Sequence, residues 1–114
     1  MSHDSLHFGI FCLTNVPEWS TEKEAVHKGI EQINLADKLG FEEAFIGEHV
    51  TDLAETITNC LIFIATLARD TKRIRLGSGT VNLANRHPAL TAARAARLST
   101  RVGRDSCKNG PKVS

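Results

Sequence analysis

Cysteine is scarce in this chain of 114 residues, tryptophan and methionine occur once each, and tyrosine is absent. The three cysteines, Cys12, Cys60 and Cys107, are odd in number and lack C-x-x-C spacing, which argues against a disulfide framework and against a metal site. The apolar run at 61–65 is far too short to cross a bilayer, and the first residues do not resemble a signal peptide. From these absences we expect a soluble, cytoplasmic protein with no metal and no membrane segment.

Neither sign of charge dominates, because 14 basic residues stand against 13 acidic ones. The basic side chains gather at the carboxyl end, where Arg97, Arg101, Arg104, Lys108 and Lys112 accompany a single acid, Asp105. Such a segment can bind nucleic acid, but this one has no aromatic residue for base stacking and no periodic apolar face. We therefore expect no nucleic-acid partner, and we interpret residues 99–114 as an irregular, disordered basic tail.

Apolar residues make up 41% of the chain, which is enough for the core of one domain. Three short apolar runs predict β-strands at residues 6–13, 41–47 and 74–81. Three helices are predicted after them, at residues 21–39, 61–69 and 88–98, and the second is apolar nearly all round, as in a buried helix. The order β-α-β-α-β-α, with connections long enough for right-handed parallel crossovers, indicates an α/β fold.

Local signals predict where two of these helices begin or end. Thr21 and Glu24 have the spacing of a capping box, in which a hydroxyl and a carboxylate bind each other's backbone N–H groups. Gly40 is suited to the left-handed conformation that ends a helix. Asn59 or Thr58 is suited to cap the start of the second helix.

Glu48-His49 follows the second predicted strand, at the end where β/α enzymes place functional groups. A histidine there can transfer protons near neutral pH, and Glu48 can orient it or hydrogen-bond nearby groups. The alternative is a loop histidine held by ordinary hydrogen bonds. One Glu-His pair does not by itself separate the two interpretations.

The segment Gly77-Ser78-Gly79-Thr80 ends the third predicted strand. Its two glycines allow the backbone to approach a flat ligand closely, or simply to bend or bulge. It is not a dinucleotide-binding fingerprint, because Asn82 stands where G-x-G-x-x-G requires its last glycine. His87 stands before Pro88. One interpretation makes His87 a site residue at the start of a helix, and the favoured one is that it hydrogen-bonds a local backbone group.

Five segments carry a more specific signal. They are Phe8-Gly9-Ile10-Phe11, Gly40-Phe41-Glu42-Glu43-Ala44, Glu48-His49, Arg73-Ile74-Arg75-Leu76-Gly77-Ser78-Gly79-Thr80-Val81-Asn82-Leu83 and Asn85-Arg86-His87-Pro88-Ala89-Leu90. Each is weak alone. Together, in this order and at this spacing across residues 8–98, they resemble the bacterial luciferase-like, flavin-dependent monooxygenases.

The resemblance implies a (β/α)8 barrel of the TIM type, of which residues 1–98 would form the incomplete amino-terminal β-α-β-α-β-α part. It implies reduced FMN, or the deazaflavin F420 in some branches, and the oxygenation of a small organic substrate with O2. Carried over by position, His49 matches the active-site histidine. Gly79 and Thr80 match a cofactor-binding segment that often holds a cis non-proline peptide. A flavin reductase partner and a homo-oligomer are implied as well.

The chain also departs from the family pattern. Val50 stands where many members have a second histidine, and Cys60 and Ala84 replace common prolines. After Leu98 the pattern breaks, and a complete barrel needs about 250 residues. We therefore expect a truncated or frameshifted product that alone binds flavin weakly or not at all.

Two other interpretations stay open. The first is a non-catalytic fragment that folds only by association with a partner chain or with itself, because three strands leave apolar sheet edges unpaired. The second is a small flavodoxin-like binding module. That module fits the alternation of strands and helices, but the chain has too few strands and no phosphate-binding loop after the first strand.

Overall fold

The computed structural model describes residues 6–102 of the chain. The strands β1 (Gly9–Cys12), β2 (Glu43–Ile46) and β3 (Arg75–Ser78) form a parallel sheet in the order β1-β2-β3. They alternate with the helices α1 (Glu22–Leu39), α2 (Cys60–Ala68) and α3 (Pro88–Val102), and a short 3-10 helix, η1 (Leu83–Asn85), precedes α3. The predicted β-α-β-α-β-α order is confirmed.

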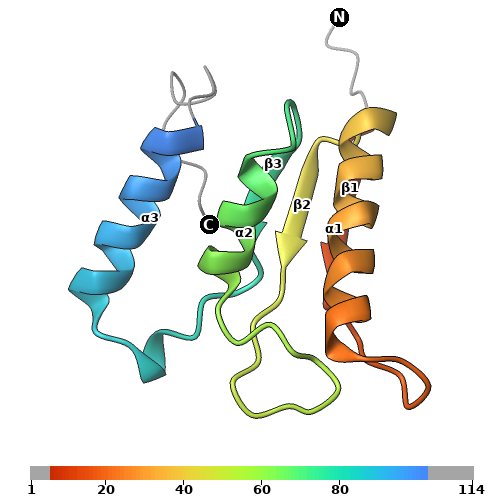
Figure 1. The fold of residues 1–114 in the computed structure, drawn as a ribbon. Helices are drawn as coiled ribbons and strands as arrows, with labels where there is room; N and C mark the ends of the chain where they lie inside the picture. Colours follow the sequence, from red (N-terminus) through yellow and green to blue (C-terminus); the bar gives the residue numbers. More distant parts are fainter. Residues whose placement is uncertain (1–5, 103–114) are drawn as a thin grey trace, which may run out of the picture.

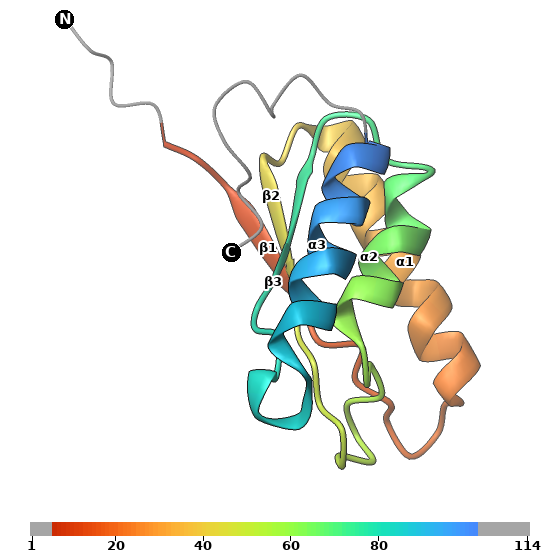
Figure 2. The ribbon, with the colours of Figure 1, turned by 90° about the vertical axis from the view of Figure 1, so that its left-hand side faces the viewer.

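All three helices lie on one face of the sheet, as Figure 2 shows with the strands to the left of the helices. The cause is the strand order, because successive right-handed crossovers between neighbouring parallel strands place every helix on the same side. Side chains alternate between the two faces, so Cys12 and Ile46 are buried against the helices. Phe11 points to the opposite face, where it stays 55% exposed.

Helix α1 begins and ends where the local signals predict. The Thr21 hydroxyl accepts a hydrogen bond from the Glu24 backbone N–H at 3.3 Å, and the Glu24 carboxylate accepts one from the Thr21 N–H at 2.9 Å. At the other end Gly40 adopts a φ of +87°, which only glycine tolerates easily. The Phe41 N–H then bonds the Ala36 carbonyl at 3.0 Å and closes the last turn.

Helix α2 is capped by Asn59, whose side-chain oxygen accepts from the Ile62 N–H at 3.3 Å. The expectation that this helix is buried nearly all round is wrong. Cys60, Ile64 and Leu67 pack into the core, whereas Ile62 on the outer side is 65% exposed. The helix covers the sheet with one side only, and its outer side, with Ile62, Ala65 and Thr66, is exposed.

Asp37 fixes the turn that leads into β3. Its carboxylate, on the buried side of helix α1, accepts the backbone N–H groups of Lys72, Arg73 and Ile74 at 2.8, 2.8 and 2.7 Å. Ile74 is itself fully buried, and it belongs to the core between the sheet and helices α1 and α2. This contact joins residues far apart in the sequence and sets where β3 begins.

Helix α3 starts at Pro88, which is tolerated at a first helical position because no helical partner exists for its missing N–H. It continues to Val102, so the helix extends beyond the end predicted for it at Leu98. Residues 99–102 contain neither glycine nor proline and therefore offer no backbone obstacle to a helix. The rest of the predicted tail, residues 103–114, lies outside the described residues. None of the helices within residues 6–102 has the length and apolar character needed to span a membrane.

Candidate functional site

The carboxyl ends of the three strands meet at one edge of the sheet, because the strands are parallel. In Figure 1 this is the lower edge, where the loops that follow β1, β2 and β3 emerge. The ladder continues one step past the strands. The Gly47 N–H bonds the Cys12 carbonyl at 3.0 Å, and the Gly79 N–H bonds the Ile46 carbonyl at 2.8 Å. The residues singled out in the sequence, His49 and Gly79-Thr80, therefore lie at the same edge.

His49 opens the long loop between β2 and α2. Its ring Nε2 lies 2.5 Å from the Glu55 Oε2, and its side chain is 45% exposed. The His49 backbone N–H bonds the Ile57 carbonyl at 2.9 Å, which closes the loop on itself. A further bond from the Val16 N–H to the Ala54 carbonyl, at 2.8 Å, ties this loop to the one after β1. His49 is thus an accessible imidazole with a carboxylate close to one ring nitrogen.

The Gly79-Thr80 peptide bond is cis, which is the geometry that the resemblance led us to expect. Gly79 packs closely against aromatic side chains of the open face. A Cβ on Gly79 would lie 2.6 Å from Phe11 Cε2 and 3.3 Å from Phe45 Cβ, so any larger residue would have to displace the Phe11 ring. Thr80 is exposed at the edge of the sheet.

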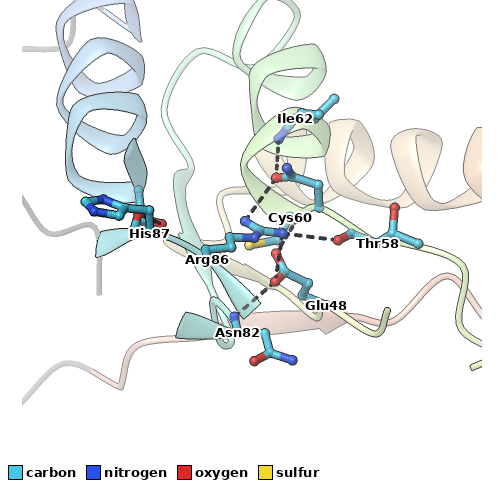
Figure 3. Close-up of polar contacts among 9 residues, drawn as sticks. Glu48, Thr58, Cys60, Ile62, Asn82, Arg86 and His87 are labelled. Carbon is cyan, nitrogen blue, oxygen red and sulfur yellow. Dashed lines mark hydrogen bonds and ion pairs between the residues drawn. The ribbon is translucent and has the colours of Figure 1, made fainter. Parts of the chain in front are cut away.

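Glu48, one residue before His49, turns into the protein and is buried (Figure 3). Its Oε2 accepts from the Cys60 N–H at the start of α2 at 2.9 Å, and its Oε1 accepts from the Asn82 N–H at 3.0 Å. The Arg86 Nη2 lies 2.9 Å from the same Oε1. Of the two roles expected for Glu48, the structure places it in the second, hydrogen bonding to nearby groups. The partner on the His49 ring is Glu55 instead.

Burial and hydrogen bonds have opposite effects on the pKa of Glu48. Burial by itself would raise the pKa of Glu48, but the hydrogen bonds from Cys60 and Asn82 and the charge of Arg86 together hold that pKa below its ordinary value. Burial, followed by the hydrogen bond and negative charge of Glu48, raises the pKa of the Cys60 thiol to about 12. At neutral pH the cluster therefore holds an ionised carboxylate beside a neutral thiol.

His87 serves the backbone at the start of α3. Its Nδ1 accepts a hydrogen bond from the Ala89 N–H at 3.2 Å, and Figure 3 shows its ring pointing away from the Glu48 cluster. The favoured structural interpretation of this residue is confirmed. Within residues 6–102 no group of three or more histidine, cysteine, aspartate or glutamate side chains could hold a metal ion.

Two hollows border the helices. A groove of about 920 Å³ runs between α2 and α3 and is lined by apolar residues together with Arg69, Arg94 and Arg97. A smaller cavity of about 330 Å³ lies between the loop after β1 and helix α1. Phe11 and Thr14 line the smaller cavity, and the Thr14 hydroxyl oxygen is buried without a hydrogen-bond partner. This cavity adjoins the edge that carries the candidate site, whereas the groove lies between the helices.

Comparison with known proteins identifies the family. Residues 6–103 match the family described as luciferase-like monooxygenase. The chain belongs to this family. One relative is the 4-hydroxyprotoasukamycin monooxygenase of Streptomyces nodosus subsp. asukaensis, 35% identical over 100 residues, which cover 88% of this chain and 27% of the relative.

Two solved structures are also similar to this chain. The oxygenating constituent of 3,6-diketocamphane monooxygenase from Pseudomonas putida, a type II Baeyer-Villiger monooxygenase in complex with FMN, has a TM-score of 0.80 and 26% identity over 86% of this chain and 27% of that one. The coenzyme F420-dependent tetrahydromethanopterin reductase of Methanopyrus kandleri has a TM-score of 0.61 and 29% identity over 81% and 23%.

The chain thus spans less than a third of the length of the relatives it matches. The predicted fold class, part of a (β/α)8 barrel, is confirmed. The flavodoxin-like interpretation is wrong, because a doubly wound sheet carries helices on both faces and this sheet carries them on one. In a luciferase-like barrel the open face with Phe11 is the side that faces the barrel interior.

Sequence reasoning missed two residues of this edge, Glu55 and Arg86. Glu55 lies in a polar loop without periodicity, so no pattern points to its contact with His49. Arg86 lies inside the segment Asn85–Leu90, which carries part of the family resemblance. Its position in that segment was the one sequence feature that could have marked it as a candidate. Its contact with Glu48 depends on the fold.

Proposed function

We propose that this chain supplies part of the flavin site of an FMN-dependent, luciferase-like monooxygenase. The observation that carries the proposal is the common edge at which His49, the Gly79-Thr80 segment and the exposed Phe11 ring lie. The family membership supports it, as does the FMN complex of a similar structure. The oxygenation of a small organic substrate with O2 is proposed for the whole protein on the same grounds.

The residues present fit the ring of a flavin. An isoalloxazine is flat, with an apolar dimethylbenzene part beside a polar pyrimidine part, and the open face offers the apolar part a flat side chain, Phe11, that is 55% exposed. Next to it Thr80 is exposed, and Gly79 has no side chain, which lets the Phe11 ring lie against the backbone at 79–80. Phe11, Gly79 and Thr80 would hold the ring. When bound, reduced flavin supplies the electrons that activate O2.

His49 would handle protons at this site. Its ring is accessible, and the Glu55 carboxylate lies 2.5 Å from Nε2. The second ring nitrogen then remains for a bound molecule. In this role His49 would give a proton to, or take one from, a group of the bound flavin or substrate.

The choice of cofactor follows from the comparisons only in part. FMN is proposed because the similar oxygenating constituent binds it, and F420 stands as the alternative because an F420-dependent reductase is also similar. An oxygenating constituent implies a second component, so a separate flavin reductase is proposed as a partner. The unpaired cysteines Cys12 and Cys60 support a reducing, cytoplasmic location.

A titration with FMN tests the proposal. Because the chain holds three strands of a barrel that has eight, we expect weak but saturable quenching of the fluorescence of oxidised FMN by the purified chain, with an α/β circular dichroism spectrum. His49→Ala should weaken FMN binding or abolish the quenching of FMN fluorescence. His27→Ala, at an exposed position on α1, should leave the affinity and the quenching unchanged. A folded chain that shows no saturable binding of oxidised or reduced FMN, and none of F420, would contradict the proposal.

A second candidate function is that of a fragment that acts by association. It is favoured by the sheet itself, because within the described residues β1 and β3 each pair with β2 alone and one face of the sheet carries no helix. Association with a second copy or with another chain would cover these edges. Sedimentation velocity over a range of concentrations tests this candidate, since a monomer at all concentrations would count against self-association.

A further inference from the structure

We infer that Glu48 and Arg86 are positioning residues, which hold His49 and the Gly79-Thr80 peptide in a fixed relation to each other. The inference rests on the proposed flavin site and extends it to two residues that do not line it. Neither residue takes part in a chemical step. Their role is to connect the loop after β2 with the loop after β3.

The Glu48 carboxylate binds both loops at once. Glu48 directly precedes His49, so a fixed Glu48 side chain limits where the His49 backbone can lie. Its Oε1 accepts the N–H of Asn82, two residues after Thr80, at 3.0 Å. Its Oε2 accepts the N–H of Cys60 at 2.9 Å, which adds the first turn of α2 to the same anchor. One side chain therefore links three segments that are separate in the sequence.

Arg86 completes the anchor from the far end of the loop after β3. Its Nη2 lies 2.9 Å from Glu48 Oε1 and donates to the Thr58 carbonyl at 3.1 Å (Figure 3). Its Nη1 donates to the Asn59 side-chain oxygen at 3.5 Å. The loop after β3, from the Gly79-Thr80 peptide to Arg86, is thus held at Asn82 and again at Arg86.

Burial makes this connection rigid. The Glu48 side chain is 0% exposed and that of Arg86 is 14% exposed, so water cannot readily replace either partner. The hydrogen bonds and the nearby guanidinium lower the Glu48 pKa, so the carboxylate stays ionised at neutral pH. A buried carboxylate with donors on both oxygens has few alternative positions, which suits a residue that sets the geometry of its neighbours.

The chain contains a matched control on the same sheet. Glu43 and Arg75 form another ion pair, with 2.5 Å between Glu43 Oε1 and Arg75 Nη2, at the start of β2 and β3. Their side chains are 39% and 38% exposed. This pair also joins β2 to β3, but at the amino ends of the strands, away from His49 and Thr80. If the loss of any Glu-Arg pair had the same general effect, substitution of Glu43 and substitution of Glu48 should change the protein in the same way.

The experiment compares Glu48→Gln with Glu43→Gln in the full chain. Glutamine keeps the shape of Glu48 but turns one of its two acceptor oxygens into an NH2 group that faces a donor. We expect the NMR signals of the His49 ring and of the Thr80 amide to shift together in Glu48→Gln, and FMN affinity to fall by about tenfold. Arg86→Met should do the same, and Arg86→Lys should restore part of the affinity. Glu43→Gln should change neither signal nor affinity.

Unchanged His49 and Thr80 signals in a folded Glu48→Gln chain would overturn the inference. Equal shifts in Glu43→Gln would overturn it too, because the effect would then be general. Where Glu48→Gln fails to fold, the same comparison is made with Arg86→Lys, which keeps the positive charge. If the unmodified chain binds no flavin, the proposed function fails, and the paired NMR shifts still decide whether Glu48 positions the two segments.

Discussion

The carboxylate of Asp37 offers the sharpest test of how this fold is held together. It accepts three backbone N–H groups of the turn before β3, from Lys72, Arg73 and Ile74. Hydrogen bonds to a charged group contribute about 1.5–3 kcal/mol each, and an unpaired buried N–H costs about 1–3 kcal/mol. Ile74 is fully buried, whereas Lys72 and Arg73 are exposed residues whose N–H groups can rebind water. We therefore expect Asp37→Ala to lower the free energy of unfolding by roughly 3–5 kcal/mol.

Asparagine at the same position separates the hydrogen bonds from the charge. Oδ1 of Asp37 accepts from both Arg73 and Ile74, and Oδ2 accepts from Lys72. An asparagine can keep its oxygen at the Oδ1 position and, of these three bonds, lose the one to Lys72, so Asp37→Asn should cost about 1–2 kcal/mol. The order expected is the unmodified chain, then Asp37→Asn, then Asp37→Ala.

Urea unfolding followed by far-ultraviolet circular dichroism measures both values, with Asp70→Asn at a nearby exposed position as the control. The total stability of a small domain is about 5–15 kcal/mol, so the alanine variant should lose a large part of it. A cost below about 1 kcal/mol for Asp37→Ala would refute the reasoning. Equal costs for alanine and asparagine would refute the division among the three bonds.

Three further predictions follow from single contacts. Thr21→Ala removes the acceptor for the Glu24 N–H and should lower the free energy of unfolding by about 1 kcal/mol in the same urea assay, with exposed Thr51→Ala as a control. Cys60, buried and with a pKa of about 12, should react with iodoacetamide far more slowly in the folded chain than in urea, as peptide mass mapping can measure, and equal rates would contradict its burial. The pKa of Glu48 is lower in the folded chain than its ordinary value of about 4.3, so ionised Glu48 stabilises the fold above that ordinary value. This stabilisation is lost as the pH falls through the lower, folded pKa. The difference in unfolding free energy between the unmodified chain and Glu48→Gln should therefore shrink from about pH 7 to about pH 3.

The predicted strands were longer than the observed ones. The apolar run at 6–13 contains β1 at Gly9–Cys12, and the run at 74–81 contains β3 at Arg75–Ser78. A strand needs a partner as well as apolar residues, and the register with β2 covers Glu43–Ile46, with single backbone hydrogen bonds one step beyond it. The pattern along one strand cannot indicate where its neighbour's pairing ends.

The candidate site divides in the same way. His49 and Gly79-Thr80 could be identified because they follow apolar strands and match a family pattern. Glu55 and Arg86 were missed, since their contacts with His49 and Glu48 join loops that belong to different strands. The role of Glu48 was predicted only as one of two alternatives, and its burial beside Cys60 and Asn82 selected between them.

The sequence by itself determined the order of strands and helices, the capping box at Thr21 and the end of α1 at Gly40, and it narrowed the cap of α2 to Thr58 or Asn59. These features depend on residues within about one helical turn of each other, so their physical causes are visible in a short stretch of chain. The tertiary structure decided the contacts of Asp37, Glu48 and Arg86. Those side chains bind backbone groups that lie up to 37 residues away, and such contacts exist only once the crossovers have brought the segments together.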